Sequence, residues 1–336
     1  MILTLTPNPS LDRTVSLPGP LQRGAVQRLT GVVMEPGGKG VNVARVLSNA
    51  GRAATAVLPA AENDPILTAL GALELPGLTV RSVPVAGPAR INTAVTEPDG
   101  TTTKLNELGA GLSEEEIDAV EQALLETLTL TGVSAEADTH HWAVLSGSLP
   151  PGAPARWYAR LVGLLREAAP GLRIAVDTSD EPLAALAAEL PASAPDLIKP
   201  NGEELGQLAG LPAERAMALE EGAVEGNYDP VVDAARLLVG LGIGAVMATL
   251  GPAGAVLVTG EGAWHATAPE VPVVSTVGAG DSSVAGYVLA DVRGGDEAER
   301  LRTAMIYGSA AASLPGTTLP SPSDLPAQGP VVTRLV

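Results

Sequence analysis

The residues of this chain that are best placed to do chemistry lie at 275–290, where a glycine-rich turn carries one carboxylate. Gly278-Ala279-Gly280-Asp281 follows a β-branched run at 271–274 and precedes an apolar run, which predicts a strand, a turn and a helix start. Glycine allows a close backbone approach to a ligand, and the free N–H groups at a helix start bind anions. Asp281 would repel an anion that is only held there. We therefore expect Asp281 either to take a proton from a hydroxyl that attacks the anion or to cap the helix.

A second glycine-rich turn, Gly37-Gly38-Lys39-Gly40, opens an apolar helical segment that closes at Gly51. It is not a Walker P-loop, because no Ser or Thr follows the lysine, and it lacks the G-x-G-x-x-G fingerprint of dinucleotide sites. Asn42, one turn into this helix, could hydrogen-bond a ligand rich in hydroxyl groups. The alternative is a tight turn that only begins a helix.

The basic residues are informative because the chain has a net charge of −18. This charge argues against nucleic acid and anionic membrane as main partners. Only three of the 20 basic residues are lysines, Lys39, Lys104 and Lys199, and each lies in a polar, loop-like motif. A compact ammonium suits a tight phosphate site better than a guanidinium does. Arg90 and Lys104 flank a predicted hairpin that turns at 98–100, where they could reach an anion or only be solvated at the surface.

From residue 113 onward, strands alternate with helices, which predicts a parallel sheet with helices on both faces. Such sheets bind ligands at the carboxyl ends of their strands. We expect 220–229 to be a polar loop and the proline-rich segment 319–330 to be loosely attached. Polar groups gather at the predicted strand ends: Asp12, Ser146, Ser148, Asp177, Lys199, Asn201, Thr249 and Gly251.

The overall composition suits a soluble globular enzyme with one large α/β domain and a smaller appendage. The chain has 336 residues, of which 46% are hydrophobic and 17% charged. The sequence contains no apolar run of about 18 residues, so it predicts no membrane span. Residues 1–6 are predicted to form a strand and do not resemble a signal peptide. The absence of cysteine is consistent with a cytoplasmic location. His140 and His141 have no third ligand nearby in sequence, which favours a structural role for the pair over a metal site.

Three motifs together resemble the PfkB family of carbohydrate kinases, which has the ribokinase-like fold: the glycine-rich segments 36–45 and 275–282, and Asn201-Gly202-Glu203-Glu204. The similarity runs from residue 2 to about residue 318. It implies a three-layer α/β/α domain with a mostly parallel sheet, built from 1–11, 37–87 and 110–318. It also implies a small β-sheet lid from 12–36 and 88–109, a C-terminal tail at 319–336, and a homodimer formed through the lid.

The resemblance implies a role for each matching residue. Asp281 would be the general base, while Gly278, Ala279 and Gly280 would offer backbone N–H groups to the transferring phosphoryl group. Asn201 and Glu204 would position Mg²⁺, partly through water. The sugar would contact Asp12, Gly38, Asn42 and Ser148. The nucleotide, ATP, would contact Lys199, Asn201, Thr249, Gly251, Gly254 and Gly308.

Within the family, the chain resembles the branch that acts on sugar phosphates. The resemblance lies in segments 3–12 and 104–107 and in the Ser275-Thr276 pair. This implies ATP-dependent phosphorylation of a ketohexose phosphate, with fructose 1-phosphate giving fructose 1,6-bisphosphate as the leading case. Fructose 6-phosphate and tagatose 6-phosphate are the alternatives. The cations expected near the substrate's own phosphate are Arg28, Lys39, Arg90 and Lys104.

Two features depart from the family pattern: Asp180 stands where a glycine is usual, and 220–229 resembles an insertion. A non-catalytic sugar or nucleotide sensor is a second class of function, but it would not need Asp281 beside Asn201 and Glu204. A dinucleotide oxidoreductase is disfavoured by the missing fingerprint.

Overall fold

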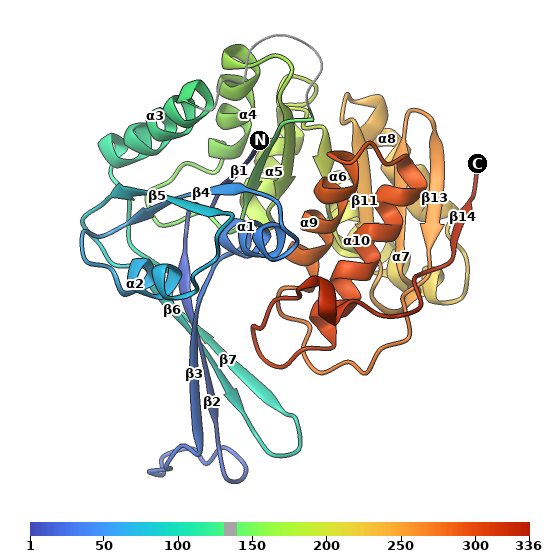
Figure 1. Cartoon of the computed structure of the whole chain (residues 1–336). Helices are drawn as coiled ribbons and strands as arrows, with labels where there is room; N and C mark the ends of the chain where they lie inside the picture. Colours follow the sequence, from blue (N-terminus) through green and yellow to red (C-terminus); the bar gives the residue numbers. More distant parts are fainter. Residues whose placement is uncertain (131–139) are drawn as a thin grey trace.

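Two β-sheets organise the chain in the computed structural model, which describes residues 1–130 and 140–336 (Figure 1). The larger has ten strands in the order β14-β13-β12-β11-β10-β9-β8-β1-β4-β5, and the smaller has four in the order β3-β2-β6-β7. The strands of the large sheet are β1 (Ile2–Leu5), β4 (Ala54–Ala60), β5 (Leu78–Pro84), β8 (Trp142–Ser146), β9 (Arg173–Asp177), β10 (Leu197–Ile198), β11 (Ala245–Thr249), β12 (Ala255–Thr259), β13 (Gly262–Ala266) and β14 (Val332–Arg334).

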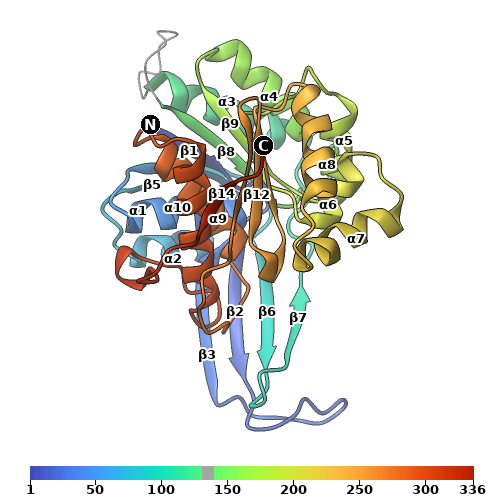
Figure 2. The same cartoon turned by 90° about the vertical axis from the view of Figure 1, so that its right-hand side faces the viewer.

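The large sheet is parallel from β5 to β11 and antiparallel from β11 to β14. Its central strands are apolar on both faces, so helices must cover both of them. One face carries α1 (Lys39–Asn49), α2 (Pro65–Ala72), α9 (Ala279–Asp291) and α10 (Glu297–Ala312). The other carries α3 (Glu114–Leu130), α4 (Trp157–Ala168), α5 (Asp180–Ala188), α6 (Gly202–Leu208), α7 (Ala213–Val224) and α8 (Asp229–Gly240). Figure 2 shows these two layers with the sheet between them, which confirms the predicted three-layer architecture.

The small sheet projects from this body (Figures 1 and 2). It consists of two antiparallel hairpins, β2 (Ser10–Ser16) with β3 (Gly31–Gly37) and β6 (Arg90–Thr96) with β7 (Thr102–Asn106). A parallel pairing of β2 with β6 joins the hairpins. Leu11 is buried where β2 meets the body, whereas Val33 and Leu105 further out are 57% and 59% exposed.

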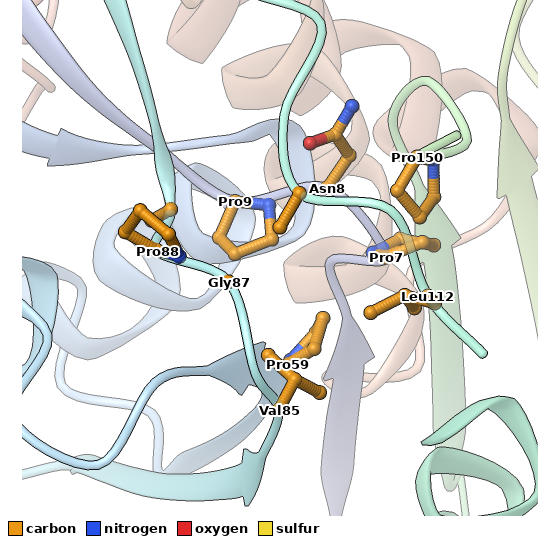
Figure 3. A pocket seen from close by; sticks show the side chains of 11 residues that line it. Pro7, Asn8, Pro9, Pro59, Val85, Gly87, Pro88, Leu112 and Pro150 are labelled. Atoms are coloured by element: carbon orange, nitrogen blue, oxygen red, sulfur yellow. The ribbon is translucent and has the colours of Figure 1, made fainter. Parts of the chain in front are cut away.

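The chain passes between the two sheets through a proline-rich junction. The β1–β2, β5–β6 and β7–α3 connections all line one narrow pocket, and Figure 3 shows Pro7, Pro9, Pro59, Pro88 and Pro150 around it. Proline fixes its own φ and restricts the preceding residue. The junction therefore limits the backbone conformations that connect the small sheet to the body.

Three expectations for secondary structure were wrong. Residues 271–274 form no strand, because Pro272 cannot donate to a sheet, and Val274 and Ser275 instead donate their N–H groups to Ala312 at the end of α10. Most of 220–229 is helical: α7 continues to Val224 and α8 begins at Asp229. The segment 319–330 is not loosely attached throughout, because Leu319 is buried and the carbonyl groups of Pro320 and Pro330 accept hydrogen bonds from Asn49 and Arg302.

Asp180 adopts φ 56°, in the left-handed region where glycine is the usual residue and aspartate is tolerated. The backbone therefore keeps the conformation that a glycine would allow at this position. In the part of the chain that the structure describes, no helix is long and apolar enough to cross a membrane.

Candidate active site

Asp281 lies in the first turn of α9, at the carboxyl edge of the large sheet. Gly278 is the residue just before the helix; it has φ 77° and offers no side chain to cap the first turn. Asp281 does not act as the cap, because its Oδ2 accepts a hydrogen bond at 2.8 Å from Nδ2 of Asn42 on the neighbouring helix α1. The Ala279 N–H donates to Thr276 O, and the N–H groups of Gly280 and Asp281 have no hydrogen-bond partner among the described residues. The start of α9 can therefore receive an anion, with a buried carboxylate beside it.

Two lysines meet next to this turn on one carboxylate. Asp177, at the end of β9 and 3% exposed, lies 3.0 Å from Nζ of Lys39 and 3.5 Å from Nζ of Lys199. A Cβ on Gly280 would lie 3.2 Å from Nζ of Lys199, so this lysine packs directly against the start of α9. We refer to Lys39, Asn42, Asp177, Lys199 and Asp281 together as the Asp281 cluster.

The charges of the cluster shift its pKa values. Burial raises the pKa of Asp281 to about 6, against the opposing effects of Lys39 and of the Asn42 hydrogen bond. Burial would also raise the pKa of Asp177, but Lys199 and Lys39 outweigh it and hold that pKa below its usual value. Burial would lower the pKa of Lys39, but Asp177 and Asp281 raise it overall. Asp177 is therefore ionised at neutral pH and pairs with two lysines, and Asp281 is the carboxylate of the cluster whose pKa lies closer to neutral pH.

The uncapped N-terminus of α1 lies at the second glycine-rich turn. Gly38 precedes the helix with φ 102° and provides no side-chain cap. Arg45 fixes the other side of this turn, because its guanidinium donates to the carbonyl of Pro36 at 2.6 Å. The two glycine-rich turns predicted from the sequence thus both form helix starts that can receive an anion, and both adjoin the Asp281 cluster.

Asp12 on β2 is oriented by its neighbours in the small sheet. Its Oδ1 accepts hydrogen bonds from Ser10 Oγ at 2.8 Å and from Asn92 Nδ2 at 3.0 Å. Its Oδ2 lies over Gly37, where a Cβ would be only 2.1 Å away. Because Oδ1 already has two donors, Oδ2 remains the oxygen that can accept from a ligand hydroxyl.

Strand register places Arg90 and Lys104 on the face of the small sheet that carries Asp12. Ser10 pairs with Arg90, Asp12 with Asn92, and Ala94 with Lys104, so these side chains alternate onto one face. The Nε of Arg90 is buried without a hydrogen-bond partner among the described residues. Lys104 is exposed on the edge strand β7.

Arg28 is not brought to this site within one chain. It is exposed in the loop between β2 and β3, beyond the Ser16–Gly31 pair, at the end of the small sheet far from the body. Asp12 lies four residues before the end of β2, so roughly 13 Å of strand separates it from that loop.

Asn201 and Glu204 begin α6 as a reciprocal capping box. Asn201 Oδ1 accepts from the Glu204 N–H, and Glu204 Oε2 accepts from the Asn201 N–H, both at 2.8 Å. Glu204 is close enough to raise the pKa of Lys39. Among the described residues, no group of three or more His, Cys, Asp or Glu side chains could hold a metal ion on its own.

The remaining predicted nucleotide residues lie around one loop, apart from Gly308. Thr249 ends β11 and donates to Pro200 O, which ties it to the end of β10. Gly251 (φ 53°) and Gly254 (φ 88°) bound the short helix η1 (Gly251–Ala253). Gly308 instead is buried between α10 and α9, where a Cβ would lie 2.2 Å from Ser283 Oγ. Ser148, predicted to contact the sugar, is exposed after β8 and lies 3.4 Å from Asn8.

Sequence reasoning listed Asp177 only as a polar strand end and gave Ser10 and Asn92 no role. The lysines that Asp177 holds are distant in sequence or on another strand, so no local spacing indicates the pairing. Ser10 is two residues from Asp12, and the period-two alternation of strands could have placed Ser10 and Asp12 on one face.

Comparison with known proteins extends these observations. Residues 8–324 match the model of a family described as pfkB family carbohydrate kinase. The chain is 37% identical over 335 residues to a 1-phosphofructokinase from Rhodobacter capsulatus, covering 99% of this chain and 96% of the relative. It is 33% identical over 327 residues to the ATP-dependent 6-phosphofructokinase isozyme 2 of Escherichia coli, covering 96% of each.

The chain is also similar in fold to solved structures of kinases. The tetrameric inhibited form of phosphofructokinase-2 from Escherichia coli superposes with a TM-score of 0.78 at 32% identity, covering 94% of this chain and 95% of the other. A ribokinase from Arabidopsis thaliana, complexed with ribose and ATP, superposes with a TM-score of 0.65 at 20% identity, covering 97% and 95%. The second likeness concerns the fold alone and confirms that the fold is ribokinase-like.

Proposed function

Because the chain belongs to the pfkB family of carbohydrate kinases, we propose that it transfers the γ-phosphoryl group of ATP to a ketohexose phosphate, with fructose 1-phosphate as the leading substrate. The observation that carries the proposal is the position of Asp281. This buried carboxylate, held by Asn42, lies beside an uncapped helix start and a pair of lysines. A sensor that only bound sugar would have no use for a proton acceptor at that place.

In the proposed reaction, Asp281 takes the proton of the acceptor hydroxyl. The hydroxyl oxygen forms a bond to the γ-phosphorus of ATP, and the bond from that phosphorus to the β–γ bridging oxygen breaks and releases ADP. Backbone N–H groups of Gly278, Ala279 and Gly280 face the negative charge that spreads over the phosphoryl oxygens. Lys199 lies against the same turn and would neutralise the phosphate chain.

Mg²⁺ would lie near Asn201 and Glu204, and when bound it would neutralise charge on the β- and γ-phosphates. The residues fit this ion, because Mg²⁺ keeps several waters and needs only one or two carboxylates besides the phosphates. Glu204 uses Oε2 in the capping box, and its Oε1 has no partner among the described residues. We therefore assign Glu204 the direct or water-mediated contact and Asn201 the task of orienting the start of α6.

Arg90 supports a phosphorylated acceptor over a free sugar. Its partly buried guanidinium forms no ion pair with the described residues, its Nε lacks a hydrogen-bond partner, and it lies near Asp12. A buried donor without a partner is costly, and a ligand phosphate would satisfy it. Asp12 Oδ2 would accept a hydroxyl of the same ligand, so the substrate would lie between the small sheet and the Asp281 cluster.

The test is ADP release from Mg-ATP with a matched panel of acceptors. We expect turnover with fructose 1-phosphate and at least tenfold lower kcat/KM with fructose 6-phosphate, tagatose 6-phosphate, free fructose and ribose. A preference for fructose 6-phosphate would instead place the chain with the 6-phosphofructokinase relative. Turnover with free sugars alone would contradict the proposal, and so would the absence of turnover with every acceptor of the panel.

The activity should depend on pH through Asp281. Because the base must be ionised and its pKa is about 6, kcat is expected to be flat above pH 7 and to fall about tenfold per pH unit well below 6. Sugar phosphates also titrate near pH 6, so the control is Asn42→Ala. The hydrogen bond from Asn42 lowers the Asp281 pKa. Its loss should therefore raise that pKa and move the midpoint of the pH–kcat profile to higher pH. A midpoint that stays in place would attribute the profile to the substrate.

We further propose that the small sheet mediates a homodimer. It exposes Val32, Met34 and Leu105 on one face and Val33 on the other. Contiguous exposed apolar side chains are typical of protein–protein contact surfaces. The tetramer of the Escherichia coli relative shows that self-association occurs in the family. In such a dimer, Arg28 could reach a substrate phosphate only in the partner chain, since its own site lies at the other end of the sheet.

Light scattering after size exclusion would test the dimer. We expect wild type to run as a dimer or larger. Val33→Glu and Leu105→Glu place a charge on opposite faces of the small sheet, and the variant whose face is covered in the dimer should run as a monomer. The variant on the uncovered face serves as the matched control. A monomeric wild type, or two variants that both stay dimeric, would contradict the proposal.

A further inference from the structure

Glu220 is a carboxylate without a partner at the loop predicted to bind the nucleotide. It lies in α7 and is half-buried, and it forms no hydrogen bond or ion pair with the residues that the structure describes. A partly desolvated carboxylate without donors is unfavourable, so such a group in a binding site is expected to meet a donor when the ligand is bound.

The position of Glu220 is set by two glycines. A Cβ on Gly251 would lie 2.7 Å from Glu220 Oε1, and a Cβ on Gly202 would lie 3.2 Å from Glu220 Cβ. Gly202 begins α6 and Gly251 begins η1. The carboxylate therefore enters the space between two loops at the carboxyl ends of β10 and β11, and any side chain at Gly251 would displace it.

The order of the strands indicates which part of the nucleotide meets Glu220. Asp177 ends β9, Lys199 follows β10 and Gly251 lies two residues after β11, and these strands are neighbours in that order. Asn201 forms a parallel bridge with Thr249, so Gly251 follows the strand next to that of Lys199, on the side away from Asp177, and lies two residues beyond this bridge. A nucleotide whose terminal phosphate faces Asp281 and whose phosphate chain passes Lys199 would place its ribose near Gly251.

We propose that Glu220 accepts a hydrogen bond from the ribose hydroxyls of the nucleotide and thereby selects ribonucleotides. The inference rests on the proposed kinase function, because that function places the phosphates at Lys199. A carboxylate has acceptors only, so it suits a sugar hydroxyl and disfavours a phosphate. Unlike the backbone contacts of the phosphate turn, this contact distinguishes one nucleotide sugar from another.

The test compares Mg-ATP with Mg-2′,3′-dideoxy-ATP for wild type, Glu220→Ala and Glu221→Ala. Glu221 is the exposed neighbour on the same helix and serves as the matched control. Wild type and Glu221→Ala are expected to use the dideoxy nucleotide with about tenfold lower kcat/KM, the usual scale of one hydrogen bond to a charged group. In Glu220→Ala the two nucleotides should differ by less than about twofold, because KM for ATP rises while kcat changes little.

Other outcomes overturn the assignment. An equal loss with both nucleotides would mean that Glu220 only supports the loop, and an equal gain would mean that it repels the phosphates. If no acceptor supports turnover, the proposed function fails separately, and calorimetric binding of Mg-ADP against Mg-2′,3′-dideoxy-ADP still measures the ribose contact. If Glu220→Ala melts well below Glu221→Ala, Glu220→Gln is used in its place. Discrimination between the two nucleotides that equals that of wild type in Glu220→Gln would refute a charged acceptor.

Discussion

Asp281→Asn is expected to lower kcat at least about a hundredfold, the scale of a general base, with little change in KM. Asparagine keeps the shape and the contact with Asn42 but cannot accept the proton. The thermal midpoint at pH 7.5 should stay equal or rise. A carboxyl whose folded pKa lies above its unfolded value destabilises the fold at pH values above both, and the amide removes that cost. Steady-state kinetics and a melting curve measure the two effects.

Asp291→Asn is the matched control for that prediction. Asp291 is a second buried aspartate on α9, at the opposite end of the helix, and it accepts from Trp142 Nε1 at 2.8 Å and pairs with Arg300 at 3.0 Å and with Arg173. Weakening a buried ion network costs stability, up to about 3–5 kcal/mol when a charge is left uncompensated. This variant should therefore melt lower and keep its kcat. If Asp281→Asn instead melts lower and keeps activity, Asp281 is structural and the mechanism is wrong.

Gly38→Ala is expected to reduce kcat/KM for the sugar phosphate about a hundredfold. Gly38 has φ 102°, and a Cβ would lie 2.6 Å from Thr6 Cγ2 and 3.2 Å from Pro9 Cα. Both strain and overlap would push the start of α1 away from β1, and misplacing catalytic groups by about 1 Å costs on this order. Lys39 and Asn42 would move with the helix. We also expect a loss of roughly 2–5 kcal/mol in stability from strain and overpacking.

Gly51→Ala separates these two causes. Gly51 follows the other end of α1 with φ 75°, but a Cβ there would meet nothing within 4 Å. Only the backbone penalty of about 1–2 kcal/mol should appear, with activity unchanged. Equal kinetic losses in the two variants would mean that α1 responds to strain anywhere along it, and that the contact of Gly38 with Thr6 has no special importance.

The parts of the site that sequence reasoning predicted best are those whose chemistry is local. A glycine pair, a charged residue and an apolar helix are adjacent in the chain, so both helix starts could be recognised before any fold was known. Strand alternation likewise placed Arg90 and Lys104 on a hairpin, and the register confirms that hairpin. Their roles toward a substrate stay predictions.

What the sequence could not indicate depends on distant pairing. Asp177 acquires its role only when α1 and β10 bring Lys39 and Lys199 to it. At 271–274 the sequence predicted a strand that does not form. A β-branched run carries the same local signal whether or not a sheet edge is available to it. The β-branched run at 331–333 has a partner, β13, and forms β14. Propensity describes a half-buried pleated surface, and only tertiary structure decides where that surface exists.

The pairing of β2 with β6 has a consequence for how the chain folds and opens. Residue 10 lies opposite residue 90, and the segment between the two hairpins, from α1 to β5, belongs to the large body. Closing that loop is unfavourable until β1, β4 and β5 are already in place. The small sheet should therefore assemble last, and its amides should exchange hydrogen through openings that leave the body folded. A partner chain bound to the sheet would suppress those openings, so association and the order of the substrate site would be coupled through one late-forming unit.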